Sequence, residues 1–457
     1  MKKILRVSLG FLSATGLMAS VNGCDAWLSS RPAYGHLSEY KPLRLLVVSQ
    51  PLTYQRIHEL EKGFEFDLLQ QFAVDMGYRL NVRIVKNEKT LLRELEKGKG
   101  DLGAARLNDF LVGASSLPRS PVYDEEKSSL VCHKDLTVEL DSEGQLTSKN
   151  NWKLVLNSYR TEASWFRHFQ KQTPTLKISL KKNSSTARLL KNLVEKKNEC
   201  TLLDRLEARH ALKLFPQLKV MKDLSPAYSY FFVMSEARTD LSQQFRIWLT
   251  KAAQDRVLSQ TKNRFLGKNS VLSDSEIRRF AKDRERVLPL YSSLFKRHGQ
   301  SFRLPWQLAA AVAYQESKWK PDAQSFTGVK GFMQLTQETA QHLGVEDRLD
   351  TNQSIWGGIK YLRMLLNRQP KGLPFKERLA LALATYNIGP AHMWDAQKLA
   401  QRLGKDPYAW RDLQEVLPLL ADQDYLPYLK YGPARGREPV DYVHRVFGYL
   451  DLITIQI

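Results

Sequence analysis

The spacing of apolar residues changes part-way along this 457-residue chain, and the change restricts the folds it can adopt. Up to about residue 266, short apolar runs typical of strands alternate with segments in which apolar residues recur at helical spacing. Beyond about residue 286 only the helical spacing remains. Alternating strands and helices indicate an α/β sheet domain, and a run of helices indicates an all-α domain. The sequence therefore predicts two domains, as the chain length also does.

The first domain is expected over residues 41–267. The alternation of strands and helices occurs in two successive parts of this domain, which predicts two lobes. Its expected strands are 43–48, 79–85, 101–105, 153–156, 176–180 and 201–203, and its expected helices are 64–76, 89–97, 164–170, 186–195 and 241–258. The polar, charged stretch 268–285 is interpreted as a linker. The second domain, 286–457, is expected to hold helices over 287–297, 306–317, 355–367, 377–388, 391–403 and 442–452.

The chain is strongly basic, with a formal net charge of +21. Such a surface suits nucleic acid, anionic lipid or a polyanionic wall, or is a basic solvated surface without a partner. The sequence contains no zinc-ligand spacing, no glycine-rich phosphate loop and no dense arginine block with aromatic residues between. We therefore expect no nucleic-acid partner, no metal and no organic cofactor.

The amino terminus has the order of a secretory signal. Basic residues precede an apolar stretch over 7–21 that is too short to span a bilayer, and Gly23 and Cys24 follow it. Residues 21–24 resemble a bacterial lipobox, in which the cysteine is acylated, although Asn22 is unusual there. This predicts a signal peptide over 1–24, lipidation at Cys24 and a tether over 25–40. The alternatives are ordinary signal cleavage nearby or an uncleaved amphipathic anchor.

Export implies an oxidising compartment, in which Cys132 and Cys200 either form a disulfide or remain two buried thiols. The sequence leaves that choice open. Asp25, directly after Cys24, resembles the inner-membrane retention signal of some enteric lipoproteins.

Three blocks in the second half stand in a fixed order: Ala-Tyr-Gln-Glu-Ser at 313–317, Gly-Val-Lys-Gly-Phe-Met-Gln-Leu at 328–335 and Ala-Thr-Tyr-Asn at 384–387. Together they resemble the family 1 lytic transglycosylases, and Tyr442-Val443 fits the same resemblance. The resemblance implies a lysozyme-like all-α fold that acts on peptidoglycan strands. It places the protein in the periplasm at the inner face of the outer membrane, whereas Asp25 favours the inner membrane.

Glu316 is the candidate catalytic residue. On its expected helix it falls at the edge of an apolar stripe, where desolvation raises a carboxyl pKa toward that of a general acid. The resemblance implies that Glu316 protonates the oxygen between N-acetylmuramic acid and N-acetylglucosamine. It then accepts the proton of the muramic C6 hydroxyl, which attacks C1 and leaves a 1,6-anhydro end. The alternative is a hydrolytic muramidase, for which Asp322 and Glu338 are the nearby water-positioning acids.

The blocks also supply candidate substrate-binding residues, with turn glycines, a soft apolar side chain, and amide, hydroxyl and phenol groups that hydrogen-bond sugars. These are Ser325, Gly331, Met333, Gln334, Tyr386, Asn387 and Tyr442.

The first domain resembles the extracellular solute-binding proteins that serve amino-acid uptake, through residues 63–69, 100–102, 121–123 and 202–204. The resemblance implies a periplasmic bilobal fold with Asp204 on the α-amino group of a ligand. The arginine that grips a carboxylate in that family is not evident, because Arg106 comes too early. A muropeptide is therefore the expected ligand. A rigid spacer, or a non-catalytic glycan- or muropeptide-binding sensor, is the alternative.

Overall fold

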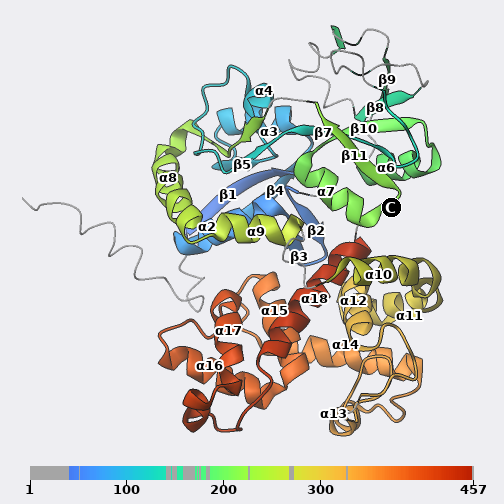
Figure 1. Cartoon of the computed structure of the whole chain (residues 1–457). Helices are drawn as coiled ribbons and strands as arrows, with labels where there is room; N and C mark the ends of the chain where they lie inside the picture. Colours follow the sequence, from blue (N-terminus) through green and yellow to red (C-terminus); the bar gives the residue numbers. More distant parts are fainter. Residues whose placement is uncertain are drawn as a thin grey trace, which may run out of the picture.

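The computed structural model describes residues 41–454 apart from 51, 140–145, 147–151, 158–169, 172, 174–175, 182–185, 225–226, 267–271 and 326–327. The signal segment, the tether, Cys24, Asp25 and most of the expected helix 164–170 lie outside these residues. The rest forms a bilobal α/β domain followed by an all-α domain, as the sequence predicts, and the two lie against each other (Figure 1). No described helix is both long and apolar enough to cross a bilayer.

Lobe 1 contains a four-stranded sheet in the order β13-β5-β1-β4. Its strands are β1 (Lys41–Val48), β4 (Tyr78–Val85), β5 (Leu102–Ala104) and β13 (Val233–Met234). Side chains of β1 alternate between the sheet faces, so Leu45 packs with the cluster around α2 (Phe64–Asp75) and α8 (Thr239–Gln254), and Leu46 packs toward α3 (Glu88–Glu96). Both faces of this sheet are covered.

Lobe 2 contains a five-stranded sheet in the order β11-β7-β10-β8-β9. Its elements are β7 (Ser128–His133), β8 (Lys153–Asn157), β9 (Lys177–Lys181), β10 (Glu199–Asp204), β11 (Leu218–Asp223), α6 (Thr186–Glu195) and α7 (Arg205–Leu214). Cys132 and Cys200 lie opposite each other on β7 and β10 and form a disulfide. The pairing that the sequence left open is thus decided by strand register.

A two-stranded antiparallel ribbon joins the lobes, made of β6 (Asp124–Glu126) and β12 (Tyr228–Tyr230). The chain enters lobe 2 through β6 and returns through β12. Smaller elements complete the domain, namely β2 (Gln55–Ile57), β3 (Leu60–Lys62), α4 (Asp109–Val112), η3 (Glu236–Arg238) and α9 (Val257–Leu266). The helix expected over 241–258 is interrupted between α8 and α9, where Arg256 has a φ of 59°.

The all-α domain surrounds a helix, α12 (Trp306–Ser317), whose buried residues run from Leu308 to Tyr314 without a break. A helix that is apolar on all sides belongs inside a core. Around it lie α11 (Leu288–Ser301), α13 (Gln337–Leu343), α14 (Thr351–Arg368), α15 (Phe375–Ile388), α16 (Pro390–Arg402), α17 (Trp410–Val416), η4 (Leu417–Ala421), η5 (Gln423–Tyr428) and α18 (Arg437–Thr454).

The prediction of a linker over 268–285 is wrong for most of that segment, because residues 274–286 form helix α10 (Asp274–Arg286). Ser273 and Glu276 form a capping box at its start. Phe280 is buried in the helical core and packs edge-on against Tyr314 of α12. The few apolar residues of this segment stand among many charged residues, which is typical of a linker. Their helical spacing nevertheless places them on one side of α10, where they pack into the core of the helical domain.

The two domains are in direct contact through ionic side chains and a few apolar ones. Leu60 and Val74 of lobe 1 belong to the core cluster of the helical domain. Three ion pairs between described residues cross from one domain to the other: Lys62–Asp451 at 2.7 Å, Lys376–Asp67 at 2.6 Å and Arg411–Asp75 at 2.9 Å. Lobe 1 therefore holds both α18 and the α15–α17 side of the helical domain.

Candidate active site

Glu316 stands one residue before the end of α12, where the chain turns sharply. Lys318 and Trp319 both have left-handed backbone angles, with φ of 54° and 56°. Such angles in residues other than glycine cost about 1–3 kcal/mol each and need support from neighbours. The Trp319 indole N–H donates to the carbonyl of Ala310 at 2.8 Å, and the Ser317 hydroxyl donates to the carbonyl of Phe332 at 2.8 Å. The carboxyl group is thus held on a rigid turn.

The surroundings of Glu316 raise its pKa to about 7, and burial is the main cause. The side chain is half-buried at the carboxyl end of α12, where the helix dipole also disfavours negative charge. A hydrogen bond from Tyr442 and the positive charge of Lys318 lower the pKa, and the charge of Glu438 raises it. The desolvation predicted for Glu316 is confirmed. At neutral pH this group can both give and take a proton.

Two tyrosines approach Glu316 from other helices. The Tyr442 hydroxyl of α18 donates to Oε1 of Glu316 at 2.5 Å. The Tyr386 hydroxyl of α15 donates to the carbonyl of Met333 at 2.9 Å, and its ring stacks on Tyr442 with the ring centroids 6.4 Å apart. Burial raises the pKa of both phenols well above the usual value, so both act as proton-bearing donors. The structure brings these two predicted residues together with Glu316.

The loop between α12 and α13 holds the Gly-Phe-Met-Gln block behind the site. Gly331 has a φ of 82°, and a Cβ there would lie 1.7 Å from the carbonyl oxygen of Arg348. The Gln334 amide donates to the carbonyls of Ala323 at 2.9 Å and Gly331 at 2.8 Å. Gln334 therefore uses its N–H groups to shape the loop. The Ser325 backbone N–H donates to the carbonyl of Val329 at 3.0 Å, within the same loop.

Met333, expected to contact the substrate, lies away from the surface in the structure. Its side chain is completely buried. It lies against Gly358 of α14, where a Cβ would come within 2.5 Å of the Met333 side chain. Met333 supports the site from the core side, and its carbonyl holds the Tyr386 hydroxyl.

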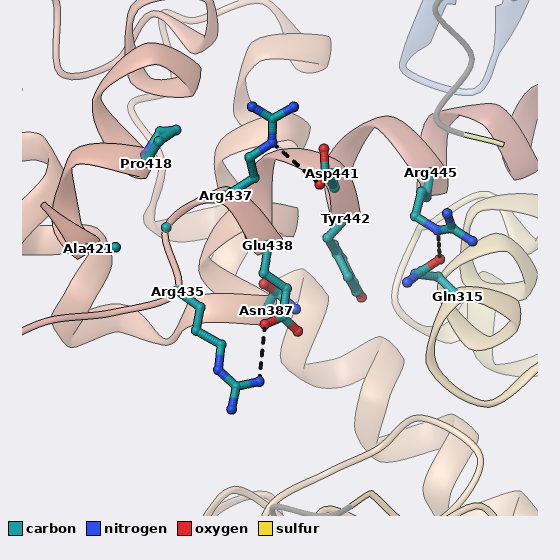
Figure 2. A pocket seen from close by; sticks show the side chains of 11 residues that line it. Gln315, Asn387, Pro418, Ala421, Arg435, Arg437, Glu438, Asp441, Tyr442 and Arg445 are labelled. Carbon is teal, nitrogen blue, oxygen red and sulfur yellow. Dashed lines mark hydrogen bonds and ion pairs between the residues drawn. The ribbon is translucent and has the colours of Figure 1, made fainter.

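A cavity of about 450 Å³ is bounded by α12, α15, η4 and the start of α18. Gln315 lines it and Glu316 does not, but Tyr442, which also lines it, donates to the Glu316 carboxyl group. The predicted residues Asn387 and Tyr442 line it, together with Glu438 and Asp441 (Figure 2). Glu438 was missed by the sequence reasoning. Its signal was available, because it stands four residues before Tyr442 and so on the same face of α18.

A second group supports the residue next to Glu316. The Arg445 guanidinium of α18 donates to the Gln315 side-chain oxygen at 3.0 Å and forms an ion pair with Glu276 of α10. Helix α10, expected to be a linker, therefore helps to fix the end of α12. Asp322 and Glu338, the acids considered for a muramidase, are both exposed, and the carboxylate that acts on the Glu316 pKa is Glu438.

Asp204, predicted as a ligand-binding acid, lies at the end of β10 and is buried where the two lobes meet. Its Oδ1 accepts from the backbone N–H of Glu207 at 2.8 Å and so caps α7. Its Oδ2 accepts from Arg106 of lobe 1 at 3.3 Å. Arg106, whose position in the sequence seemed too early, therefore reaches Asp204 of the other lobe.

Comparisons with known proteins show the family of this chain. The Transglycosylase SLT domain family matches residues 293–409. Membrane-bound lytic murein transglycosylase F 2 of Alkalilimnicola ehrlichii is 34% identical over 96% of this chain and 97% of its own. Membrane-bound lytic murein transglycosylase F of Pseudomonas fluorescens is 31% identical over 97% of this chain and 90% of its own.

Among solved structures, an ancestral cationic amino acid solute-binding protein covers 49% of this chain and 95% of its own, with 15% identity and a TM-score of 0.42. The whole-length relatives carry the family assignment, since their similarity extends over both domains. The chain belongs to the membrane-bound lytic murein transglycosylase F family.

Proposed function

We propose that this protein is a peptidoglycan lytic transglycosylase that cleaves the β-1,4 bond from N-acetylmuramic acid to N-acetylglucosamine and leaves 1,6-anhydro ends. The observation that carries the proposal is Glu316, a half-buried carboxyl group with a pKa of about 7 whose hydrogen-bond partner Tyr442 lines a cavity. The names of the relatives supply the substrate class.

In the proposed mechanism one carboxyl group serves twice. Protonated Glu316 gives its proton to the glycosidic oxygen as the bond to C1 breaks. The resulting carboxylate takes the proton of the muramic C6 hydroxyl, whose oxygen closes onto C1 of the same sugar. Because the nucleophile belongs to the substrate, a second carboxylate is not required, and the fixed geometry lowers the barrier by several kcal/mol. Tyr442 engages Oε1, so Oε2 faces the reacting oxygens in this proposal.

The remaining candidate residues have supporting parts in this proposal. Asn387 and Tyr442, at the cavity wall, contact the sugars. Gly331, Gln334 and Ser325 shape the loop on which the sugars rest, and Tyr386 and Met333 hold that loop to α15.

Mass spectrometry of the fragments released from purified sacculi tests the reaction and its catalyst together. We expect anhydro-muramic products from the wild-type chain, a loss of at least about 10²-fold in the Glu316→Gln variant, and no loss in the control Glu338→Gln. Reducing-end products instead would indicate a hydrolytic muramidase with Glu438 as the water-positioning acid. The absence of products from the wild type would favour the sensor alternative.

We propose that lipidation of Cys24 anchors the protein and leaves both domains in the periplasm. The support is the lipobox resemblance at residues 21–24 and the words "membrane-bound" in the names of the relatives. Family resemblance favours the outer membrane, and Asp25 favours the inner one. Density-gradient fractionation of cells separates these, and Cys24→Ser is expected to move the protein to the soluble fraction.

We further propose that the α/β domain binds a cell-wall peptide between its two lobes, with Asp204 as the acid that receives a positively charged group. The burial of Asp204 and its place where the lobes meet support this role. A spacer would not need a buried carboxylate at that point, because burying one is costly. Calorimetry of the full chain with muropeptides tests it, and no heat of binding would favour a spacer.

A further inference from the structure

Two exposed aromatic side chains meet at a right angle on the surface of the helical domain. Trp394 of α16 and Tyr431, which follows η5, are 42% and 47% exposed. Their ring centroids lie 6.0 Å apart, with an angle of 84° between the ring planes. Tryptophan is highly buried on average, so a tryptophan and a tyrosine exposed side by side mark a surface that binds another molecule. We call this pair the aromatic corner.

Two lysines lie close to the aromatic corner. The Lys430 Nζ is 5.5 Å from the Trp394 ring centroid and 5.2 Å from the Tyr431 ring centroid. The Lys398 Nζ is 5.7 Å from the Trp394 ring centroid, a distance at which a ring attracts an ammonium group. Lys398 donates to the Gln401 side-chain oxygen at 3.3 Å, and within the described part of the chain neither lysine pairs with a carboxylate. The corner therefore combines aromatic rings with positive charge.

A buried carboxylate holds the corner together. Asp395, next to Trp394 on α16, is completely buried and accepts the backbone N–H groups of Lys430 at 2.9 Å and Tyr431 at 2.8 Å. Burying a carboxylate is costly unless hydrogen bonds satisfy it, and these two bonds do so here. The place of Lys430 and Tyr431 beside Trp394 is thus fixed by the fold.

The corner is continuous with the cavity described above. Tyr431 begins a segment that reaches the cavity at Arg435, which lines it (Figure 2). Four residues span at most about 14 Å, so the corner lies within that distance of the cavity wall. The segment is held on η4, because the Ala434 N–H donates to the carbonyl of Leu420 at 3.1 Å. A long ligand that extends from the cavity along this segment reaches the corner.

Sugar rings and carboxylates suit such a surface. The C–H groups on the face of a sugar ring carry slight positive charge and pack against the negative face of an aromatic ring. The two lysines attract negatively charged groups. An anionic lipid surface also binds rings and lysines, but it does not require a surface continuous with a cavity. A glycan strand that bears carboxylates fits both observations.

We infer that the aromatic corner, with Lys398 and Lys430, holds the peptidoglycan strand outside the site of cleavage. Its ligand is an amino-sugar strand whose attached peptides carry carboxylates, so that the rings bind a sugar and the lysines bind the carboxylates. This inference rests on the proposed peptidoglycan substrate. It concerns how the strand is held, whereas the proposed reaction concerns how the strand is cut.

Co-sedimentation with purified sacculi tests the rings in the Glu316→Gln background, in which no cleavage is expected. We expect Trp394→Ala/Tyr431→Ala to bind about tenfold more weakly, because two ring contacts are lost. Trp394→Phe alone is expected to keep at least about half of the binding, since it retains a ring face. The control Leu290→Ala, which shortens a 69% exposed side chain of α11, is expected to bind as before. Equal binding by the double variant and this control would overturn the inference.

The lysines are tested with sacculi whose carboxylates have been converted to amides. Lys398→Met/Lys430→Met is expected to bind native sacculi about three- to tenfold more weakly and to bind amidated sacculi as well as its parent does. The control Lys296→Met/Lys360→Met removes the same charge from beside two other tryptophans of the domain. A loss of equal size in the control, or on amidated sacculi, would overturn the part assigned to the lysines.

Vesicles of phosphatidylcholine and phosphatidylglycerol test the lipid alternative, with Cys24→Ser in every chain so that no acyl anchor contributes. We expect no vesicle binding that depends on Trp394 or Tyr431. Vesicle binding that is lost in Trp394→Ala/Tyr431→Ala while sacculus binding is kept would assign the corner to a membrane and overturn the inference. Binding is measured without cleavage. If the wild type released no anhydro products but the double variant still lost sacculus binding, the proposed activity would fail and this inference would hold.

Discussion

Glu316 is a half-buried carboxyl group with a raised pKa, which distinguishes it from a surface carboxylate. Burial raises its pKa to about 7, while Tyr442 and Lys318 act in the opposite direction and keep the proton exchangeable near neutral pH. The acid glutamate of lysozyme follows the same pattern, since an apolar pocket raises its pKa as well. The free enzyme must be protonated at Glu316 to begin the proposed reaction, so activity is expected to fall as pH rises through about 7.

The Tyr442→Phe variant tests this balance. The phenol donates to the carboxylate form, so its removal raises the Glu316 pKa and moves the alkaline limb of kcat/KM to higher pH, by about one unit. The control is Tyr408→Phe, a partly buried tyrosine elsewhere in the same domain. A limb that stays in place or moves to lower pH would show that the hydrogen bond does not stabilise the charged form.

At the scale of elements, the loop from α12 to α13 contains two glycines that are needed for different reasons. Gly328 and Gly331 both have a φ of 82°, but a Cβ at Gly328 meets no atom within 4 Å, whereas a Cβ at Gly331 overlaps the Arg348 carbonyl. The two positions therefore separate backbone strain from a steric clash.

Alanine substitutions at these two positions are expected to differ. Gly328→Ala should lower the free energy of unfolding by about 1–2 kcal/mol, the cost of the left-handed angle alone. Gly331→Ala should cost roughly 1–3 kcal/mol more, because the Arg348 segment must move, and it should also reduce sacculus digestion. Denaturant unfolding of both variants provides the measurement, and equal losses would contradict the role of the clash.

Helix α10 shows how a charged segment becomes part of a core. Its charges predict a linker, yet Ser273-Asp274-Ser275-Glu276 is a capping-box sequence that signals a helix start. Its Asp283 accepts the Tyr314 hydroxyl at 2.7 Å, and its Glu276 pairs with Arg445. The first contact holds Tyr314, and the second holds the Arg445 side chain that contacts Gln315, so both lie close to Glu316 on α12.

At the scale of the whole molecule, the domains are joined mainly by ion pairs. Lys62 of β3 donates to Asp451 and Thr454 near the end of α18, both at 2.7 Å, and Tyr442 stands on the same helix. Salt screens partly exposed ion pairs, so this contact is expected to weaken as ionic strength rises.

The double variant Lys62→Met/Lys376→Met removes one cation from each of two interdomain pairs. We expect it to lose about 0.5–1 kcal/mol of domain coupling per pair and to unfold in two separated calorimetric transitions. The wild type is expected to show two transitions only at high salt. The matched control is Lys405→Met, whose pair with Glu415 at 2.6 Å lies within the helical domain. A double variant that unfolds like this control would show that the ion pairs do not couple the domains.

The sequence by itself determined the order of the two domains, most of the described helices, six of the thirteen described strands and the choice of Glu316 as the candidate acid. It could do so because the spacing of apolar residues and short motifs are local properties. Only the tertiary structure decided the Cys132–Cys200 disulfide, the burial of Met333 and the meeting of Arg106 with Asp204. Each of these depends on which distant segments share a sheet, a core or a cleft. Which distant segments come into contact depends on the packing of the whole chain, and the residues next to each position in the sequence do not reveal it.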